Sequence, residues 1–294
     1  MQLLAQDTVA PYYILLFALI VFIIVYLILK NITYKKGAYY KITKLSYFSV
    51  YNDKGRYGEY LIYKNLKYFE TEGAKFLFNV YIPKKNSRMT EIDVLMISSK
   101  GIFVFESKNY SGWIFGNENH ENWCQALSLG WGRCKKNYFY NPIMQNQHHI
   151  EALKSWLGVK IPVYSIVAFS DRCTLKDVTV NNHNVYVINR SNVVSVVLNI
   201  WSQRRSSELT GEQVFDIYNR LYPYSQVSEN VKKRHVRSIA LKCPRCKREL
   251  VLRTVKKESS ETNKFYRCAN YPKCTYIRRI SKNNPKNSND YFFD

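Results

Sequence analysis

The sequence predicts an α/β protein in which one mixed β-sheet is flanked by helices, preceded by a membrane-spanning helix and followed by a small metal-binding module. Three observations lead to this prediction. Between residues 53 and 224, apolar segments of strand length intermix with apolar stripes at helical spacing. Residues 9–29 form an uncharged apolar run. Residues 241–281 contain four cysteines at metal-ligand spacing.

The charge of the chain is strongly positive and unevenly distributed. Its 294 residues include 44 Lys or Arg and 22 Asp or Glu, which gives a formal net charge of +22. Residues 230–294 hold 18 Lys or Arg against 5 Asp or Glu, so this C-terminal part carries +13 of the total. An excess of this size indicates a polyanionic partner, either nucleic acid or an anionic membrane surface.

Residues 9–29 are predicted to cross a membrane as one helix. The run has no charged residue, and about 20 apolar residues are needed to span a bilayer. A cleaved signal peptide is the alternative, but the run has no basic segment before it and no small-x-small cleavage site after it. Lys30, Lys35 and Lys36 follow the run, whereas only Asp7 precedes it. The positive-inside rule therefore places the N-terminus outside the cell membrane and the rest of the chain in the cytoplasm.

Three further segments are predicted to contribute no core. Residues 31–52, rich in Tyr, Lys and Ser, are predicted to be a juxtamembrane linker that either lies on anionic headgroups or is solvated. Residues 225–240 are predicted to be a basic linker. Residues 282–294, rich in Asn and Lys, are predicted to be a disordered tail.

The region 53–224 is predicted to alternate helices and strands. The expected strands are one at 76–82, a pair within 91–108 joined by a turn at 99–101, a hairpin within 109–130, and two more at 163–169 and 185–188. The expected helices begin near Gly55, Pro142, Val193 and Thr210, and the last of them ends near Leu221 because Pro223 follows.

Charged residues fall at unexpected places in the strand pair within 91–108. Asp93 lies near the start of the first strand, and Glu106 and Lys108 lie near the end of the second. Because side chains alternate along a strand, Glu106 and Lys108 share a face with apolar residues of the same strand. Charges on a mostly buried face are costly unless they pair or bind a metal. A Glu106–Lys108 surface pair on an edge strand is the alternative that implies no function.

An acid, then twelve residues, then an acid-x-Lys on a strand resembles the site of the PD-(D/E)xK nucleases. Phosphodiester hydrolysis needs a hard divalent cation held by oxygen atoms, and Asp93 and Glu106 on adjacent strands can hold Mg²⁺ or Mn²⁺. The metal lowers the pKa of an attacking water and stabilises the developing charge. Lys108 can orient that water or neutralise the charge.

Four sequence blocks in order resemble the nuclease-related domain, abbreviated NERD. The blocks are Gly55-x-x-Gly58-Glu59, Glu91-Ile92-Asp93-Val94, the run from Gly101 to Gly112 that contains Glu106-Ser107-Lys108, and Asn141-Pro142-x-x-Gln145. The resemblance covers residues 54–157. It implies a restriction-endonuclease-like core, over 53–224, with metal-dependent nuclease activity. By matching positions, Glu59 and Gln145 join Asp93, Glu106 and Lys108 as the predicted catalytic residues.

Cys243, Cys246, Cys268 and Cys274 are predicted to bind one structural Zn²⁺. Two cysteines three positions apart present both sulfurs to one metal, and the second pair closes a tetrahedral site. A redox dithiol is the alternative, but it needs two cysteines rather than four. The segment is too small to hold a core unaided, so zinc would supply much of its folding free energy. Over residues 241–280 the segment resembles the zinc ribbons at the C-terminus of type IA DNA topoisomerases.

Basic and aromatic residues surround these cysteines and are predicted to bind nucleic acid. Cations attract phosphates and aromatic rings stack on bases, a combination that suits single strands. The predicted contact residues are Arg245, Lys247, Arg248, Arg253, Phe265, Tyr266, Arg267, Tyr271, Lys273, Tyr276 and Arg278. A solvated positive surface that faces the membrane is the alternative.

Other candidate residues carry weaker signals. His148 and His149 are adjacent on a predicted helix and point in different directions, so they are predicted to lie on the helix surface or to contact DNA. Cys124, Cys134 and Cys173 are scattered, which indicates no disulfide framework and suits a reducing compartment. The chain has no phosphate-binding glycine loop, so no nucleotide cofactor is predicted.

Together these features predict a membrane-anchored, Mg²⁺- or Mn²⁺-dependent nuclease that acts on DNA in preference to RNA and whose zinc ribbon binds the nucleic acid. The alternative is a non-catalytic adaptor, tethered to the membrane, in which the nuclease-like core only binds DNA or RNA.

Overall fold

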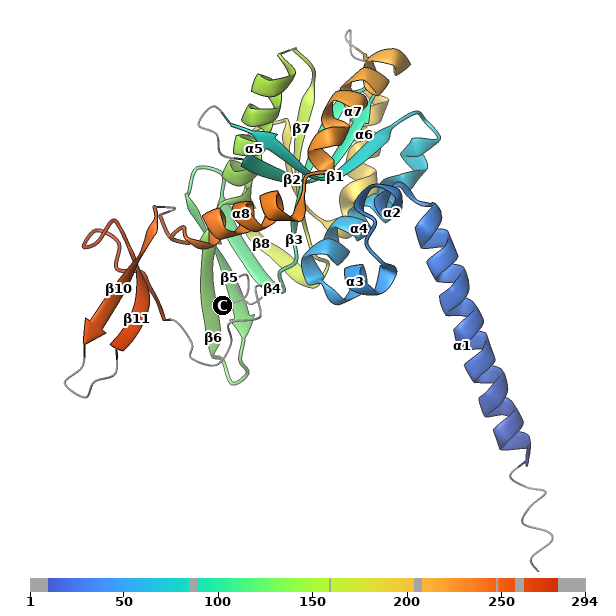
Figure 1. The fold of residues 1–294 in the computed structure, drawn as a ribbon, viewed down its shortest axis with the longest axis horizontal. Coiled ribbons are helices and arrows are strands. Elements are labelled where there is room, and N and C mark those ends of the chain that lie inside the picture. The colour runs from blue at the N-terminus through green and yellow to red at the C-terminus, as the bar shows by residue number, and fades with distance from the viewer. Residues whose placement is uncertain are drawn as a thin grey trace, which may run out of the picture.

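The computed structural model of the chain describes residues 10–84, 89–158, 160–203, 208–246, 248–256 and 262–279 (Figure 1). Its helices are α1 (Ala10–Lys36), α2 (Ala38–Thr43), α3 (Tyr47–Asn52), α4 (Lys54–Leu66), α5 (Pro142–Leu157), α6 (Val193–Ser202), α7 (Gly211–Ser225) and α8 (Glu229–Ala240), with short 3-10 turns η1 (Lys67–Glu70) and η2 (Arg190–Asn192). Its strands are β1 (Lys75–Pro83), β2 (Met89–Ser98), β3 (Gly101–Lys108), β4 (Gly112–Asn117), β5 (Asn122–Ser128), β6 (Cys134–Tyr140), β7 (Val163–Phe169), β8 (Cys173–Thr179), β9 (Val185–Asn189), β10 (Leu250–Lys256), β11 (Thr262–Cys268) and β12 (Ile277–Arg279).

A five-stranded sheet in the order β1-β2-β3-β7-β9 forms the centre of the main domain. β1, β2 and β3 pair antiparallel, whereas β3, β7 and β9 pair parallel, so the predicted mixed sheet is confirmed. β3 lies in the interior of this sheet, and its residues up to Glu106 are buried. This burial follows from the sequence, because the residues on both faces of β3 are apolar until Glu106 is reached.

Helix α5 is anchored to the middle of this sheet. Its N-cap residue Asn141 accepts hydrogen bonds from the backbone N–H groups of Ile143 and Met144, and Pro142 occupies the first helical position as predicted. Further along the helix, the fully buried Asn146 donates to the Val104 carbonyl at 3.0 Å. Its amide also donates to the hydroxyl of Ser165 on β7 at 2.9 Å. α5 is thereby fixed over β3 and β7.

A second sheet, in the order β6-β5-β4-β8, packs beside the first. The hairpin predicted within 109–130 is confirmed as β4 and β5, which pair antiparallel. β6 and β8 were not expected, because much of each strand is exposed and polar and neither carries a run of apolar residues. β6 is held in the sheet by its hydrogen bonds to β5, and β8 by its hydrogen bonds to β4.

The N-terminal region contains one long exposed helix. α1 projects away from the remaining helices and sheets (Figure 1) and is the one helix among the described residues that is long and apolar enough to cross a membrane. Its large apolar side chains from Tyr12 to Leu29 are exposed to solvent in the monomer. At the other end of α1, Tyr34 is buried in the domain and its hydroxyl donates to the Leu45 carbonyl at 2.9 Å.

Two segments that we expected to be linkers are folded. Within 31–52, the end of α1 continues into α2 and α3, and Tyr39 and Val50 are fully buried in the main core. The tyrosines of this segment pack on one another and on Phe78 instead of lying free at a membrane surface. Within 225–240, most residues form the helix α8.

Helix α7 extends further than we predicted. It continues through Pro223 to Ser225, so the expected end near Leu221 is wrong. Pro223 has no backbone N–H to donate within this last turn, but the buried Leu221 and Ser225 hold the helix end against the core. The predicted tail, 282–294, lies outside the described residues.

The turn between β2 and β3 depends on Gly101. Its φ angle is +119°, and a Cβ atom at this position would lie 2.4 Å from the carbonyl oxygen of Pro162. We expect Gly101→Ala to destabilise the chain by at least about 2 kcal/mol, from backbone strain together with overpacking. Thermal unfolding of the full-length protein in detergent measures this change.

Gly158→Ala is the matched control for this substitution. Gly158 also has a positive φ, +69°, but nothing lies within 4 Å of the position that a Cβ atom would take. If both substitutions lower stability by the same amount, the close approach of Gly101 to Pro162 has no role.

Candidate active site and cysteine cluster

Glu106 is the centre of the candidate active site. It lies near the end of the interior strand β3 and is 2% exposed. Its Oε1 atom accepts hydrogen bonds from Lys108 Nζ at 2.7 Å and from Gln145 Nε2 at 2.8 Å. Lys108 Nζ also donates to Gln145 Oε1 at 3.0 Å, which closes a three-membered network between β3 and α5. Because β3 is an interior strand, the alternative of a surface pair on an edge strand is wrong.

The structure adds His149 to this network. Its Nε2 atom lies 3.3 Å from Glu106 Oε2, and its Nδ1 atom lies 2.6 Å from the hydroxyl of Thr90 on β2. We predicted His149 at the helix surface or in contact with DNA, but its side chain is buried beside Glu106. The signal available in the sequence was its position four residues after Gln145, which places both side chains on one side of α5. His148 is exposed, as predicted.

Asp93 and Glu59 are held near this network by separate partners. Asp93 Oδ2 accepts a hydrogen bond from the backbone N–H of Ser107 at 2.8 Å, which links β2 to the end of β3. Glu59 lies on α4, and its Oε2 atom accepts from Asn79 Nδ2 at 3.1 Å and from the hydroxyl of Tyr39 at 3.3 Å. Tyr39 belongs to the segment we expected to be a linker, so the folding of α2 completes the surroundings of Glu59.

Glu91 is a fourth acidic residue of this region that we did not predict as a site residue. Its Oε1 atom accepts a hydrogen bond from the hydroxyl of Tyr81 on β1 at 2.6 Å. Its Oε2 atom lies 3.7 Å from Nε2 of His235, which brings α8 against the acidic end of β2. Glu91 stands two residues before Asp93, so alternation along β2 was the signal that could have placed both side chains together.

The carboxyl groups of this region influence one another strongly. Burial, together with the negative charge of Glu91, raises the pKa of Glu59 to about 8. Burial also raises the pKa of Asp93 well above its usual value, with Glu106 and Glu59 adding to the shift. Burial opposes the ionisation of Glu106 too, but the Lys108 ammonium and His149 outweigh it and lower its pKa to about 2. Of these three acids, Glu106 is therefore a stable carboxylate, whereas Glu59 and Asp93 resist ionisation.

The chemistry of this donor set fits a hard divalent cation. Oε2 of Glu106 is buried and faces His149 Nε2 at 3.3 Å, but it makes no hydrogen bond of good geometry to any described residue, so it keeps a lone pair for a ligand bond. Carboxylate oxygens are the ligands that Mg²⁺ and Mn²⁺ prefer. The carboxyl oxygens are not yet gathered as closely as metal ligands. Among the described residues, the C-terminal cysteines are the only group of three or more potential ligands whose donor atoms all lie within 4.8 Å of one another.

The raised pKa of Glu59 predicts a pH dependence of stability. In the unfolded chain this carboxyl ionises near its ordinary value of 4.5, whereas in the folded chain it stays protonated to about pH 8. Between these values the folded state binds the extra proton, so stability from this group falls as the pH rises. We expect the melting temperature without Mg²⁺ or Mn²⁺ to fall more steeply between about pH 5.5 and 8 in the wild type than in Glu59→Gln. Equal slopes for the two proteins would contradict the buried position of Glu59.

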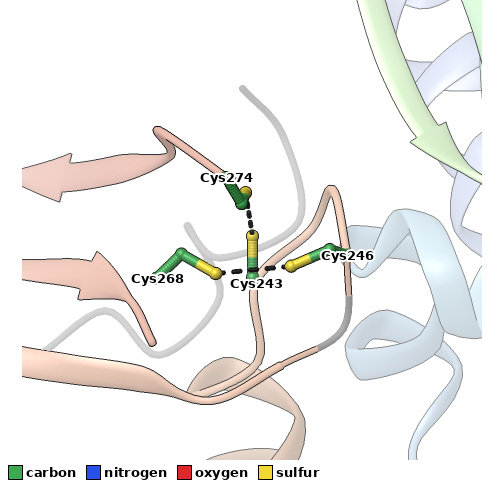
Figure 2. Close-up of side chains that lie close together, drawn as sticks. All are labelled: Cys243, Cys246, Cys268 and Cys274. Carbon is green, nitrogen blue, oxygen red and sulfur yellow. Dashed lines mark hydrogen bonds between the residues drawn. The ribbon is translucent and has the colours of Figure 1, made fainter. Parts of the chain in front are cut away.

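The four C-terminal cysteines converge on one point (Figure 2). The Sγ atoms of Cys243 and Cys274 are 3.7 Å apart, and those of Cys246 and Cys268 are 3.3 Å apart. The segment between the two pairs forms the β10–β11 hairpin, so folding of the hairpin brings the second pair back to the first. Four thiolates at this separation suit tetrahedral Zn²⁺ and leave no open coordination position for chemistry. The four predicted ligands therefore form a possible zinc-binding site.

Most of the predicted nucleic-acid contacts lie on this module, and several of them contact one another. The Arg267 guanidinium lies 3.0 Å from the centre of the Tyr271 ring, and that of Arg278 lies 4.9 Å from the centre of the Tyr266 ring. Arg245 lies 6.0 Å from the Tyr276 ring centre. Exposed residues of the predicted set are Arg245, Arg248, Arg253, Tyr271 and Lys273; Phe265 is half-buried, and Lys247 lies outside the described residues.

Comparisons with known proteins agree with both parts of this architecture. Residues 54–170 match the family described as the nuclease-related domain. An uncharacterized protein of Bacillus anthracis is 30% identical over 184 residues, which cover 63% of this chain and 82% of the relative. The chain belongs to the nuclease-related domain family. No solved structure matches the chain.

A second family match covers the C-terminal module of this nuclease-related domain protein. Residues 240–283 match the topoisomerase DNA-binding C4 zinc finger, which includes all four cysteines. The resemblance to a type IA topoisomerase zinc ribbon is therefore confirmed. The first match ends at residue 170, so η2, α6, α7 and α8 lie outside both matched regions.

Proposed function

We propose that this chain is a membrane-anchored, metal-dependent nuclease that hydrolyses phosphodiester bonds of DNA, and that its zinc ribbon binds the nucleic acid. The observation that carries this proposal is the buried Glu106. It is paired with Lys108 through one carboxylate oxygen, while its other oxygen faces His149 Nε2 at 3.3 Å and makes no hydrogen bond of good geometry among the described residues. A purely structural ion pair has no need for Asp93 and Glu59 as further acids beside it.

In this proposal Asp93 and Glu106 hold Mg²⁺ or Mn²⁺. The bound metal supplies a Lewis acid that polarises the phosphoryl group and lowers the pKa of a water molecule. Lys108 is held by Glu106 and Gln145, so its ammonium group is fixed where negative charge develops on the phosphate. Burial works against the Lys108 charge, but Glu106 outweighs it and raises the pKa of Lys108, which keeps the amine protonated. His149 positions the Glu106 carboxylate from the side of α5.

The zinc ribbon supplies affinity for the nucleic acid in this proposal. Its arginines and lysines meet the phosphates, and exposed Tyr271 offers a ring on which a base can stack. Because most of this affinity is electrostatic, it should fall steeply with salt concentration. Helix α8 joins the ribbon to the main domain and contacts the acidic end of β2 through His235, so the ribbon is tethered by a helix that touches the acidic region (Figure 1).

Helix α1 anchors the protein in the cell membrane in this proposal. The lysines at its C-terminal end favour a cytoplasmic position for the nuclease-related domain and the ribbon, with the N-terminus outside. Free nucleic acid in the cytoplasm would then be cut at the membrane surface.

Cleavage of defined DNA tests the proposal. Full-length protein in detergent, loaded with zinc, is incubated with supercoiled plasmid and with single-stranded DNA in Mg²⁺, in Mn²⁺ or in neither. We expect cleavage only with added Mg²⁺ or Mn²⁺. Binding of both DNAs without cleavage under any of these conditions would overturn the nuclease proposal and leave the non-catalytic adaptor.

A further inference from the structure

Arg190 lies at the same edge of the sheet as the candidate active site. β3, β7 and β9 are parallel, and their last residues are in register, with Lys108 beside Phe169 and Phe169 beside Asn189. Arg190 follows Asn189 directly, in η2. The carboxyl ends of parallel strands are where α/β proteins place their ligands.

The Arg190 guanidinium is buried, and two of its three nitrogen atoms have no hydrogen-bond partner among the described residues. The residue is 4% exposed, and its Nε and Nη2 atoms are buried and make no hydrogen bond to any residue of the described ranges. The acid that most affects its charge is Asp171, which lies beyond ion-pair distance and uses Oδ1 to accept from the backbone N–H of Ser191 at 2.8 Å. A buried charge without a partner is strongly destabilising, so proteins keep one only where an anion binds or function requires it.

Gly58 and Ser107 lie against this guanidinium. A Cβ atom at Gly58 would lie 3.0 Å from Arg190 Nη2 and 2.7 Å from Ser107 Oγ, so both polar atoms approach α4 at a position where only glycine fits. Ser107 Oγ is also buried without a hydrogen-bond partner in the described part of the chain. Two unsatisfied donor atoms, one from η2 and one from β3, thus approach the same residue of α4, and the third, Nε of Arg190, belongs to the same guanidinium.

We propose that Arg190 and Ser107 bind a phosphate group of the nucleic-acid backbone, an inference that rests on the proposed nuclease function. The Nε–H and one Nη2–H of a guanidinium point in the same direction along one edge, which is the fork that holds two phosphate oxygens. The Ser107 hydroxyl donates to a third oxygen. Because side chains alternate along β3, Ser107 lies on the opposite face from Glu106 and Lys108. This pocket therefore takes a phosphate next to the one that is hydrolysed.

Inorganic phosphate tests the pocket independently of cleavage. Melting temperatures of full-length protein in detergent are measured with increasing phosphate and without Mg²⁺ or Mn²⁺, for the wild type and for Arg190→Met. We expect phosphate to raise the melting temperature of the wild type and not that of Arg190→Met. Without phosphate, Arg190→Met should be at least as stable as the wild type, because it removes an unpaired buried charge. If Arg190→Met melts lower than the wild type and still gains from phosphate, Arg190 has a structural role only.

Binding of a short single-stranded oligonucleotide, again without Mg²⁺ or Mn²⁺, identifies the source of the phosphate. Arg190→Met should weaken binding and lower the slope of log affinity against log salt by about 1, as expected for one lost phosphate contact. Exposed Arg172, at the same edge, gives the matched control Arg172→Met. Unchanged oligonucleotide binding by Arg190→Met would overturn the assignment to a backbone phosphate. These assays measure binding and need no cleavage. Their results therefore test the phosphate site even if the protein proves not to be a nuclease.

Two glycine substitutions on α4 test whether the close approach of Arg190 and Ser107 to Gly58 is needed for phosphate binding. Gly58→Ala should abolish the response to phosphate, because its Cβ atom would displace Arg190 Nη2 and Ser107 Oγ. Gly55→Ala is its control, because a Cβ atom there meets only the side chain of Asp53, at 3.3 Å. A full phosphate response in Gly58→Ala would contradict the placement of the pocket.

Discussion

Glu106→Gln is expected to abolish cleavage of DNA while leaving its binding intact. The amide keeps the size of the side chain and still accepts from Lys108, but it removes the charge that holds both the metal and the ammonium group. We expect the cleavage rate to fall more than about 100-fold, because even residues one contact away from a metal ligand cost 10–100-fold when they are changed. The rate is measured on plasmid DNA with Mn²⁺, at protein concentrations that saturate the DNA.

Glu151→Gln provides the control for this loss of charge. Glu151 lies on the outer side of α5 with 61% of its side chain exposed, so its substitution should leave the rate unchanged. Melting temperatures of all three proteins separate loss of chemistry from loss of folding. A Glu106→Gln variant that is folded, binds DNA and cuts at the rate of the wild type would exclude Glu106 from the reaction.

Replacing Cys243 and Cys246 together by Ser should remove zinc and release the ribbon from the nucleic acid. Zinc supplies on the order of 10 kcal/mol to the folding of such modules, and hydroxyls do not replace thiolates as ligands. We expect zinc content to fall to background and DNA affinity to fall more than about tenfold at physiological salt, since the basic residues lose their fixed arrangement. Metal analysis and fluorescence anisotropy measure the two effects.

Cys134→Ser is the matched control, because Cys134 is an exposed cysteine on β6 outside the ribbon. It should change neither zinc content nor affinity. The double variant should also retain the main unfolding transition of the nuclease-related domain, whose core cluster contains none of the four ribbon cysteines. Zinc retained at the level of the wild type would contradict the four-cysteine site.

Local patterns predicted the parts of the fold in which neighbouring residues carry the information. The β2–β3 hairpin follows from alternation on either side of a turn that needs glycine, and the start of α5 follows from Asn141-Pro142. The zinc ligands follow from spacing alone, because a metal defines its own geometry. The pairing of Glu106 with Lys108 also required only the period of a strand.

Features that depend on distant segments escaped prediction. His149 and Arg190 enter the site region through the packing of α5 and through the parallel register of β7 and β9. Tyr39 is predicted to lie in a linker because a tyrosine suits a membrane interface. A tyrosine also suits a protein core if its hydroxyl has a hydrogen-bond partner, and in the structure Glu59 is that partner. In each case the residue type fits two environments, and only the tertiary fold decides between them.

The most direct test of the account compares plasmid nicking by the wild type and by Lys108→Met in Mn²⁺, with DNA affinity measured on the same samples. Methionine keeps the length of the side chain but removes the ammonium group that Glu106 and Gln145 hold in place. We expect DNA affinity to stay within about twofold, while the nicking rate falls by about 100-fold or more. Equal nicking rates for the two proteins, or no nicking by the wild type, would contradict the assignment of this site to DNA hydrolysis.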